Sequence, residues 1–410
     1  MSEVGIIGAG TMGSGIAQVA AVRGWTVRLM DVSTDVAQRA IQGIASRLDR
    51  LVEKSRMSRG DRDAAVARLH VASEPAAIAE CDLIVEAVVE DLDQKVGILE
   101  RLIPALRSDC TIATNTSSLS VGQIGRRLGE QARVVGMHFF NPVPLMPLVE
   151  VIRADGTSQE AADRVAQIGR AWGKTVVRCK DTPGFIVNRV ARGYYLEPLR
   201  MLGEGLAGVD EIDGVMKRLG GFRMGPFELT DLVGIDVNYT VSCSVWEQMG
   251  RPARLKPHEI QVGLFQRGEL GRKTGRGFYE YGQGAAVPVV MIQRQTVNMP
   301  PEALAAAEAF CGRAVDGGAA QASLAGRTER YIFARVLATI INEAALAFDD
   351  GVATSDDIDA AMKLGTNYPH GPLEWADAIG FDACLAVLEA LNATCDDGRF
   401  APARLLGGGK

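Results

Sequence analysis

The residues best suited to move a proton are His138, one of only four histidines in the chain, and Glu150, an acid that follows soon after it. His138 follows the apolar run 134–137. Pro142 and Pro144 then permit the chain to double back, which would bring Glu150 alongside the imidazole. A histidine with a carboxylate on one ring nitrogen and a free second nitrogen is a positioned general base. Such a pair could take the proton of an alcohol while hydride passes to a nicotinamide.

Ser117 lies in a second polar loop, which follows the apolar run 111–114. Both loops follow predicted strands of one sheet, so Ser117 and His138 can face the same crevice at the carboxyl ends of those strands. Taken alone, Ser117 could instead be the N-cap of a helix that begins near Leu119. His138 could be a core histidine beside two phenylalanines, and Glu150 could be a surface acid. Only their combination favours a catalytic site.

A glycine-rich turn near the N-terminus has the spacing of a dinucleotide-binding site. Strand, glycine turn, helix, strand and acid follow in order, with the turn at 8–13 and the acid at Asp31. Gly8 allows the tight turn, Gly10 lets backbone approach a pyrophosphate, and Gly13 lets the helix pack close to the strand. The pyrophosphate would sit on free N–H groups at the helix N-terminus. The residues expected at the dinucleotide are Gly8, Gly10, Thr11, Met12, Gly13 and Asp31.

Asp31 favours NAD over NADP. Its carboxylate can accept hydrogen bonds from both ribose hydroxyls and would repel a 2′-phosphate. The alternative role for Asp31 is the N-cap of the helix that follows it.

The first part of the chain alternates between predicted strands and helices. Further strands are expected at 83–88, 111–114 and 134–137, each after a helical segment. This pattern predicts an α/β Rossmann-type fold with a doubly wound parallel sheet. The arginine-rich stretch 47–62 is predicted to be a long helical excursion, either a solvated face or a docking surface for an anionic ligand.

The second part is helical and contains an internal repeat. The pattern of Asp, Met, Gly-Pro, Glu and Gly within 213–236 recurs 146 positions later, within 359–382. Upstream, 203–205 has a looser counterpart in 342–344. A duplicated helical unit can bury its apolar face against its twin, so the two all-α copies should pack as a pseudo-dimer. Residues 271–279 have no counterpart in the second copy.

These patterns divide the chain into four segments. We expect a Rossmann domain over 1–182, a first helical copy over 183–285, a linker with one helix over 286–325, and a second helical copy over 326–410.

The motifs resemble the L-3-hydroxyacyl-CoA dehydrogenase family, which includes 3-hydroxybutyryl-CoA dehydrogenases. The most specific stretches are 8–13, 115–118, 138–144 and 181–189. The resemblance implies an NAD-dependent oxidation of a 3-hydroxyacyl-CoA to the 3-keto form, with the acyl-CoA held between the Rossmann and helical domains. It implies that His138 is the base, that Glu150 polarises it, and that Ser117 and Asn188 bind the substrate oxygens. It also places Glu90, Lys95 and Asn115 at the NAD pocket, Lys54 at CoA and Asn141 close to the base.

The duplicated helical domain departs from the simple family pattern, in which one such domain makes a homodimer. It resembles the tandem form of 3-hydroxyadipyl-CoA dehydrogenases, as do Arg192, Tyr194, Tyr195 and the run 367–369. The resemblance leaves the acyl chain open between 3-hydroxybutyryl-CoA and 3-hydroxyadipyl-CoA. It leaves the assembly open between a monomer with an internal pseudo-dimer and a homodimer.

Bulk properties restrict the class of protein. A net charge of −6 argues against a nucleic-acid surface, and we find no apolar run long enough for a membrane span. We expect no signal peptide, reduced cysteines and a cytoplasmic location. Neither the histidines nor the cysteines have zinc-ligand spacing, so no metal is expected. Two alternatives stay open: a dehydrogenase of a free hydroxy acid or polyol on this fold, and an inactive binding relative.

Overall fold

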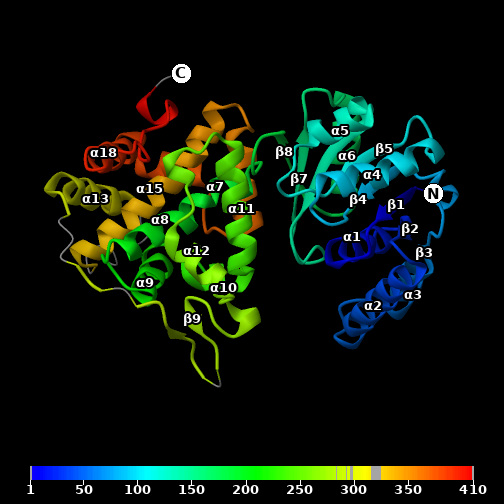
Figure 1. The fold of residues 1–410 in the computed structure, drawn as a ribbon, viewed down its shortest axis with the longest axis horizontal. Coiled ribbons are helices and arrows are strands. Elements are labelled where there is room, and N and C mark those ends of the chain that lie inside the picture. The colour runs from blue at the N-terminus through cyan, green and yellow to red at the C-terminus, as the bar shows by residue number, and fades with distance from the viewer. Residues whose placement is uncertain (1, 283, 292, 296–298, 315–324, 409–410) are drawn as a thin grey trace. The chain divides into compact units, whose positions relative to one another are not determined.

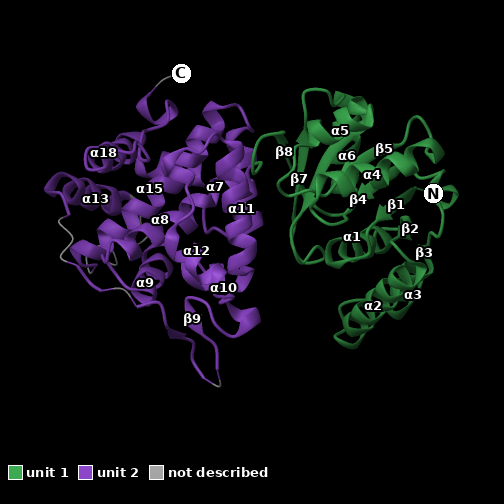
Figure 2. Cartoon of the chain, viewed as in Figure 1, with its two compact units in different colours: residues 1–185 green, residues 186–410 purple. Residues whose placement is uncertain are grey.

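The chain forms two compact units, residues 1–185 and 186–410 (Figure 2). The computed structural model describes residues 2–282, 284–291, 293–295, 299–314 and 325–408. The first unit is built on a sheet, and the second is almost entirely helical (Figure 1).

The first unit contains an eight-stranded sheet in the order β3-β2-β1-β4-β5-β6-β7-β8. The strands are β1 (Glu3–Ile7), β2 (Thr26–Met30), β3 (Leu69–Val71), β4 (Leu83–Glu86), β5 (Thr111–Thr114), β6 (Val134–Phe139), β7 (Leu148–Arg153) and β8 (Thr175–Lys180). The first six strands are parallel, which matches the predicted doubly wound sheet. β7 runs antiparallel to β6, and β8 is parallel to β7. The connection from β6 to β7 is a short turn without a helix, and only antiparallel neighbours can be joined that way.

The pairing of β6 with β7 corrects one expectation about His138. The sequence places His138 in a loop after the strand, but the strand extends through Phe139. His138 is opposite Glu150 and Phe139 is opposite Val149, and this ladder keeps both residues in strand conformation.

Helices cover the sheet, and all of them except the first begin at a serine or aspartate cap. They are α1 (Thr11–Val22), α2 (Thr34–Glu53), α3 (Arg59–Ala67), α4 (Leu92–Leu102), α5 (Val121–Leu128) and α6 (Gln159–Ala171), with short 3₁₀ turns at Pro75–Ile78, Ile103–Ala105 and Gln131–Arg133. Ser33 caps α2 and Ser120 caps α5. The alternative roles of Asp31 and Ser117 as helix caps are therefore wrong.

The predicted arginine-rich excursion is a pair of adjacent helices, α2 and α3 (Figure 1). The buried stripe of α2 includes Ile41, Ile44 and Leu48. The charged side chains of α2 lie outside this stripe. Lys54 ends α2 as its C-cap and is exposed.

The second unit consists of helices α7 (Val187–Val190), α8 (Arg192–Gly203), α9 (Val209–Gly220), α10 (Pro226–Val233), α11 (Ile235–Gln248), α12 (Glu259–Gln266), α13 (Pro301–Ala314), α15 (Arg327–Asp349), α16 (Ser355–Thr366), α17 (Pro372–Ile379) and α18 (Phe381–Asn392). Short 3₁₀ turns occur at Ala253–Leu255, Arg272–Thr274 and Leu405–Gly407, and β9 (Tyr279–Glu280) pairs with β10 (Val287–Pro288). An 18-residue window of α15 is apolar enough to cross a membrane, but 89% of it is buried inside the protein, as in a core helix.

The repeated aspartates perform the same local task in both copies. Asp213 accepts hydrogen bonds from the backbone N–H groups of Phe227 and Glu228 at the start of α10. Asp359 accepts the equivalent pair from Leu373 and Glu374 at the start of α17. Free N–H groups of the first helical turn need such acceptors, so the repeated Asp preserves the repeated helix.

The two copies pack against each other through reciprocal ion pairs between α7/α8 and α15. Arg189 pairs with Glu343 at 2.8 Å, and Arg335 pairs with Glu197 at 2.6 Å. Both pairs relate residues 146 positions apart in the sequence. Such reciprocity is the signature of a two-fold contact, here within one chain.

The same contacts correct the upstream alignment of the repeat. Arg189 also pairs with Asp350, and Arg335 with Glu204. Glu204 therefore corresponds to Asp350, and Glu343 corresponds to Glu197 rather than to a residue of 203–205. The expected match of 203–205 with 342–344 is wrong by two helical turns. Because acids two turns apart lie on one face of a helix, the sequence allows both alignments of the repeat. Only the ion-pair partners of the acids distinguish the two alignments.

The segment expected to be a linker contains a core helix. Ala303, Ala307 and Phe310 of α13 are buried, and α13 packs on α15 and α18. The rest of that segment includes 292, 296–298 and 315–324, which lie outside the described residues.

The copies differ where the first has its extra hairpin. Asp231 accepts hydrogen bonds from the N–H groups of Phe278 and Tyr279 and from the Tyr281 hydroxyl. Its counterpart Asp377 is exposed. The second copy has no segment equivalent to 271–279, so Asp377 has no hairpin to hold.

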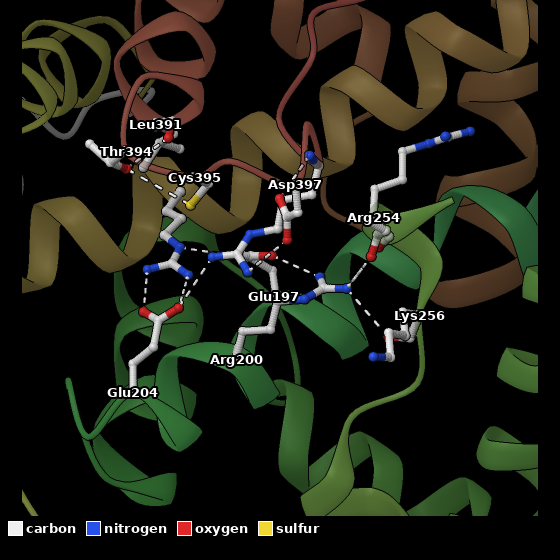
Figure 3. A network of polar contacts seen from close by, with 12 residues as sticks. Glu197, Arg200, Glu204, Arg254, Lys256, Leu391, Thr394, Cys395 and Asp397 are labelled. Atoms are coloured by element: carbon white, nitrogen blue, oxygen red, sulfur yellow. Dashed lines mark hydrogen bonds and ion pairs between the residues drawn. The ribbon is translucent and has the colours of Figure 1, made fainter. Parts of the chain in front are cut away.

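Glu197 is the centre of a buried charge network between the copies (Figure 3). It is 1% exposed and pairs with Arg335 at 2.6 Å and with Arg200 at 2.9 Å. Burial opposes the ionisation of Glu197, but the charges of Arg335 and Arg200 outweigh it and lower the pKa of Glu197 to about 2.

Replacement of this carboxylate should destabilise the protein in a pH-dependent way. Glu197→Gln should lower the free energy of unfolding at pH 7 by about 3 kcal/mol, because breaking a buried pair leaves charge uncompensated. The pKa of Glu197 is lower in the folded protein than the ordinary 4.5, so its contribution is present above that pH and is lost as the pH falls toward 2. Denaturant unfolding should therefore show a smaller difference in the free energy of unfolding between wild type and variant at pH 3 than at pH 7.

Glu280→Gln is the matched control, since Glu280 forms an exposed pair with Arg276 and should contribute little. Equal effects of the two variants, or a Glu197→Gln effect that does not change with pH, would contradict the assignment.

Candidate active site

The glycine turn between β1 and α1 has the form of a phosphate-binding loop. Gly8 has φ +101°, and a Cβ there would lie 2.6 Å from the Ala87 carbonyl oxygen. A Cβ on Gly13 would lie 1.8 Å from the Gly8 oxygen, so helix and strand approach as closely as the sequence predicts. Apart from its chain neighbours, no described residue has an atom within 4 Å of a Cβ built on Gly10, and Gly10 is the N-cap of α1. The loop therefore leaves open space in front of the helix N-terminus, which fits a pyrophosphate.

Asp31 lies beside this turn, at the end of β2. Its Oδ2 accepts a hydrogen bond from the Ala9 N–H at 2.5 Å, and Oδ1 accepts one from Val32 N–H. The carboxylate is thus held against the glycine loop, at the place where a dinucleotide ribose is expected. Of the other residues predicted in the loop, Thr11 is exposed and Met12 is half-buried at the start of α1.

Glu90 organises the loop that follows β5. One carboxylate oxygen, Oε1, accepts hydrogen bonds from the Thr116 hydroxyl at 2.7 Å and from the N–H groups of Ser117 and Ser118. It also accepts a bond from the Ser117 hydroxyl at 3.2 Å. Burial opposes the ionisation of Glu90, but the charge of Lys95 and these hydrogen bonds outweigh it and lower its pKa. Glu90 therefore fixes the position of Ser117.

Lys95 is buried among carboxylates. Its ammonium donates to Glu86 Oε1 at 2.8 Å and lies 3.2 Å from Glu90 Oε2. Glu86 also accepts a bond from the Thr114 hydroxyl at 2.6 Å. The network joins β4, α4 and β5. Lys95 is predicted to line the cofactor pocket. In the structure its ammonium forms an ion pair with Glu90.

His138 and Glu150 form the expected pair. His138 Nδ1 lies 2.7 Å from Glu150 Oε2, and both side chains are buried. An ionised carboxylate can only accept, so Nδ1 carries the hydrogen and Nε2 is left as the basic nitrogen of the neutral ring. Within the described part of the chain, Nε2 has no hydrogen-bond partner. The rings of Phe140 and Phe185 flank the imidazole, with centroids 4.6 and 5.8 Å away.

A buried lysine holds the turn between β6 and β7. Lys174 donates to the carbonyl oxygens of Val143 at 2.5 Å and Met146 at 2.7 Å. Burial, together with the nearby charge of Arg23, lowers the pKa of Lys174 to about 8. Val143 also packs against Gly15 of α1, where a Cβ would come within 2.9 Å of it. The turn is thus fixed to β8 and to the nucleotide-binding helix.

The remaining predicted residues lie on several different elements. Asn115 accepts a hydrogen bond from the Phe139 N–H at 2.8 Å and so joins the ends of β5 and β6. Asn141 is exposed at the start of the turn. Lys54 lies on the α2–α3 helix pair, and Asn188 lies in α7 of the second unit. Its counterpart in the second copy, 146 positions later, is Ala334.

Several supporting residues were not predicted from the sequence. Glu86 gave one visible signal, because a single acid in a strand buried on both faces must have a partner. Asp181 accepts bonds from Ser120 and Gly122 and fixes the start of α5. Asp181 begins the stretch 181–189 that carries the family resemblance, but its contacts with the start of α5 gave no local signal. The same holds for Lys174, because both residues bind groups distant along the chain.

Comparisons with known proteins identify the family of this chain. The 3-hydroxyacyl-CoA dehydrogenase NAD-binding domain model matches residues 3–182, and the C-terminal domain model of that family matches twice, at 184–281 and 331–407. The chain is 36% identical to 3-hydroxyadipyl-CoA dehydrogenase of Escherichia coli K12, covering 99% of this chain and 97% of that protein. It is 38% identical to human mitochondrial hydroxyacyl-coenzyme A dehydrogenase, over 68% of this chain and 91% of that one.

A solved structure shares the whole architecture. The crystal structure of 3-hydroxybutyryl-CoA dehydrogenase from Escherichia coli K12 superposes with a TM-score of 0.88 at 34% identity, covering 99% of this chain and 98% of that one. (S)-3-hydroxybutyryl-CoA dehydrogenase from Ralstonia eutropha superposes with a TM-score of 0.67 at 38% identity, over 69% of this chain and all of that one. The chain belongs to the 3-hydroxyacyl-CoA dehydrogenase family and is an NAD-dependent 3-hydroxyacyl-CoA dehydrogenase.

Proposed function

We propose that this enzyme oxidises the 3-hydroxyl of an L-3-hydroxyacyl-CoA with His138 as the general base and Glu150 as its positioning partner. The observation that carries the proposal is the 2.7 Å contact between His138 Nδ1 and Glu150 Oε2. It leaves Nε2 as the proton acceptor and gives the imidazolium that forms a buried counter-charge.

The chain's own residues divide the remaining work. Ser117, held by Glu90, and Asn188 would donate hydrogen bonds to the substrate oxygens and orient the C3 carbon. The glycine turn and Asp31 would hold NAD, and Asn115, Glu90 and Lys95 would line its pocket. When bound, NAD accepts the hydride from C3. The O–H proton passes to His138 Nε2 as the C3–O bond becomes a carbonyl.

The CoA portion is assigned to the α2–α3 helix pair. Lys54 is exposed at the end of α2, and arginines dominate the neighbouring surface. Such cations suit the phosphates of CoA. Asn141, exposed next to the base, would lie at the thioester end. For the acyl chain, the names of the relatives support 3-hydroxybutyryl-CoA and 3-hydroxyadipyl-CoA as substrates.

His138→Gln should lower kcat on the order of 10²–10⁴-fold, because glutamine cannot take the hydroxyl proton. NAD binding, measured by fluorescence titration, should survive, since His138 lies outside the glycine turn. His70→Gln, at an exposed position of β3, is the matched control and should retain activity. Turnover of His138→Gln within a fewfold of wild type would remove His138 from the mechanism.

Asp31→Ser should shift cofactor preference toward NADP. The wild-type carboxylate would repel a 2′-phosphate, so its loss should raise the ratio of NADP to NAD efficiency by about tenfold, or ~1.4 kcal/mol. Absorbance of the reduced cofactor at a saturating acyl-CoA concentration measures both efficiencies. An unchanged ratio would place the ribose elsewhere.

We also propose that the enzyme is monomeric, because the second helical copy already occupies the two-fold surface of the first. Light scattering of the purified protein should give the mass of one chain, 43.7 kDa. A stable dimer at micromolar concentration would contradict this proposal. All seven cysteines are free, which supports a cytoplasmic location.

A further inference from the structure

An arginine in the first turn of α8 is buried without a carboxylate. Arg192 is 3% exposed. Its Nε donates to the Asn188 carbonyl at 2.9 Å, and its Nη1 donates to the Ser242 hydroxyl at 2.7 Å and to the Asn238 carbonyl at 3.3 Å. All three partners are neutral. Among the described residues, no acid lies within ion-pair distance of Arg192.

The neighbouring arginines of the same unit are different. Arg189, Arg200 and Arg335 each have a glutamate within 2.9 Å. A buried guanidinium without a counter-charge has lost its hydration without replacing it by an opposite charge. In the described part of the chain the two N–H groups on Nη2 of Arg192 have no acceptor, although a guanidinium has five donors to satisfy. The fold therefore leaves the Arg192 guanidinium without a counter-charge.

A tyrosine of the second helical copy also has a donor without a partner. Tyr368 is 4% exposed, and its hydroxyl is buried without a hydrogen-bond partner. Its ring centre lies 5.6 Å from that of Tyr194, which in turn lies 6.2 Å from that of Tyr195. The Arg192 guanidinium also lies 4.8 Å from the centre of the Tyr195 ring. Burial raises the pKa of Tyr368, so the hydroxyl keeps its proton and remains a donor.

We propose that Arg192 and Tyr368 bind the terminal carboxylate of a dicarboxylic 3-hydroxyacyl-CoA. A carboxylate has two oxygens that can accept from Nη2 of Arg192 and from the Tyr368 hydroxyl, and it supplies the missing negative charge. The second copy then contributes directly to substrate selection, besides its role in packing.

The position of Arg192 close to Asn188 favours an anion that is part of the substrate. Arg192 follows Asn188 by one helical turn and bonds to its carbonyl, so the two lie on the same face, about 6 Å apart along the axis. Asn188 is the residue proposed to bind the substrate oxygens, and the inference rests on that proposed function. A short run of methylenes beyond C3 spans such a distance. One guanidinium and one hydroxyl suit a monoanion, whereas the phosphates of CoA suit the exposed cations of the α2–α3 pair.

The test compares two substrates that differ only at the acyl end: L-3-hydroxyadipyl-CoA and L-3-hydroxyhexanoyl-CoA, which has a methyl group in place of the carboxylate. Wild type should prefer the adipyl substrate in kcat/KM by at least about 100-fold, because the methyl leaves buried donors unpaired. Arg192→Met should reduce that preference on the order of 10²-fold, and Tyr368→Phe by about tenfold. Tyr239→Phe, which removes a hydroxyl from α11 outside the proposed site, should keep the full preference.

Two outcomes would overturn the carboxylate site. One is an equal kcat/KM of wild type on both substrates. The other is a fall in kcat/KM by the same factor for both substrates in Arg192→Met and Tyr368→Phe. Activity on the hexanoyl substrate would still uphold the dehydrogenase mechanism in that case. Inactivity of wild type on both substrates would instead overturn the proposed function. If Arg192→Met does not fold, the ratio for Tyr368→Phe decides, because that variant keeps the ring packing against Tyr194 and Phe222.

Discussion

The antiparallel pairing of β6 with β7 determines which carboxylate reaches His138. Directly opposed residues of two strands have their side chains on the same face, which is how Glu150 comes within 2.7 Å of the imidazole. A shift of one residue in the register would turn Glu150 to the other face of the sheet and leave His138 without a partner. The turn between the strands is therefore held from two sides, by the buried Lys174 and by the packing of Val143 on α1.

Buried charges recur in both units, and nearly all of them are compensated. Lys95 is placed between Glu86 and Glu90, and Glu197 between Arg200 and Arg335. Each of these pairs joins separate elements, so it specifies one arrangement of strands or helices at some cost in desolvation. Among the described residues, Lys174 and Arg192 do not follow the pattern, because both donate to neutral oxygens. Arg192 differs from Lys174 in that the hydroxyl of nearby Tyr368 is also buried without a partner.

The duplication gives the helical unit its partner within one chain. Reciprocal arginine–glutamate pairs on a two-fold axis are what two identical subunits would form. The copies then diverged where identity was unnecessary. Ala334 stands at the position of Asn188, and Asp377 is exposed where Asp231 holds a hairpin. The second copy thus kept the residues of the interface and lost those of the Asn188 site.

The sequence by itself determined the sheet class, the glycine turn, the duplication and the identity of the His138–Glu150 pair. Each of these depends on local spacing: the glycines on adjacent positions, the repeat on a constant offset, and the pair on two prolines that reverse the chain. Tertiary structure alone decided that His138 lies inside a strand, that α13 is part of the core, and that the repeat pairs Glu197 with Arg335. It also decided which groups Lys174, Asp181 and Arg192 bind. Those facts depend on contacts between segments far apart in the chain. The sequence around a single acid or arginine on a helix does not identify the residue that it will contact.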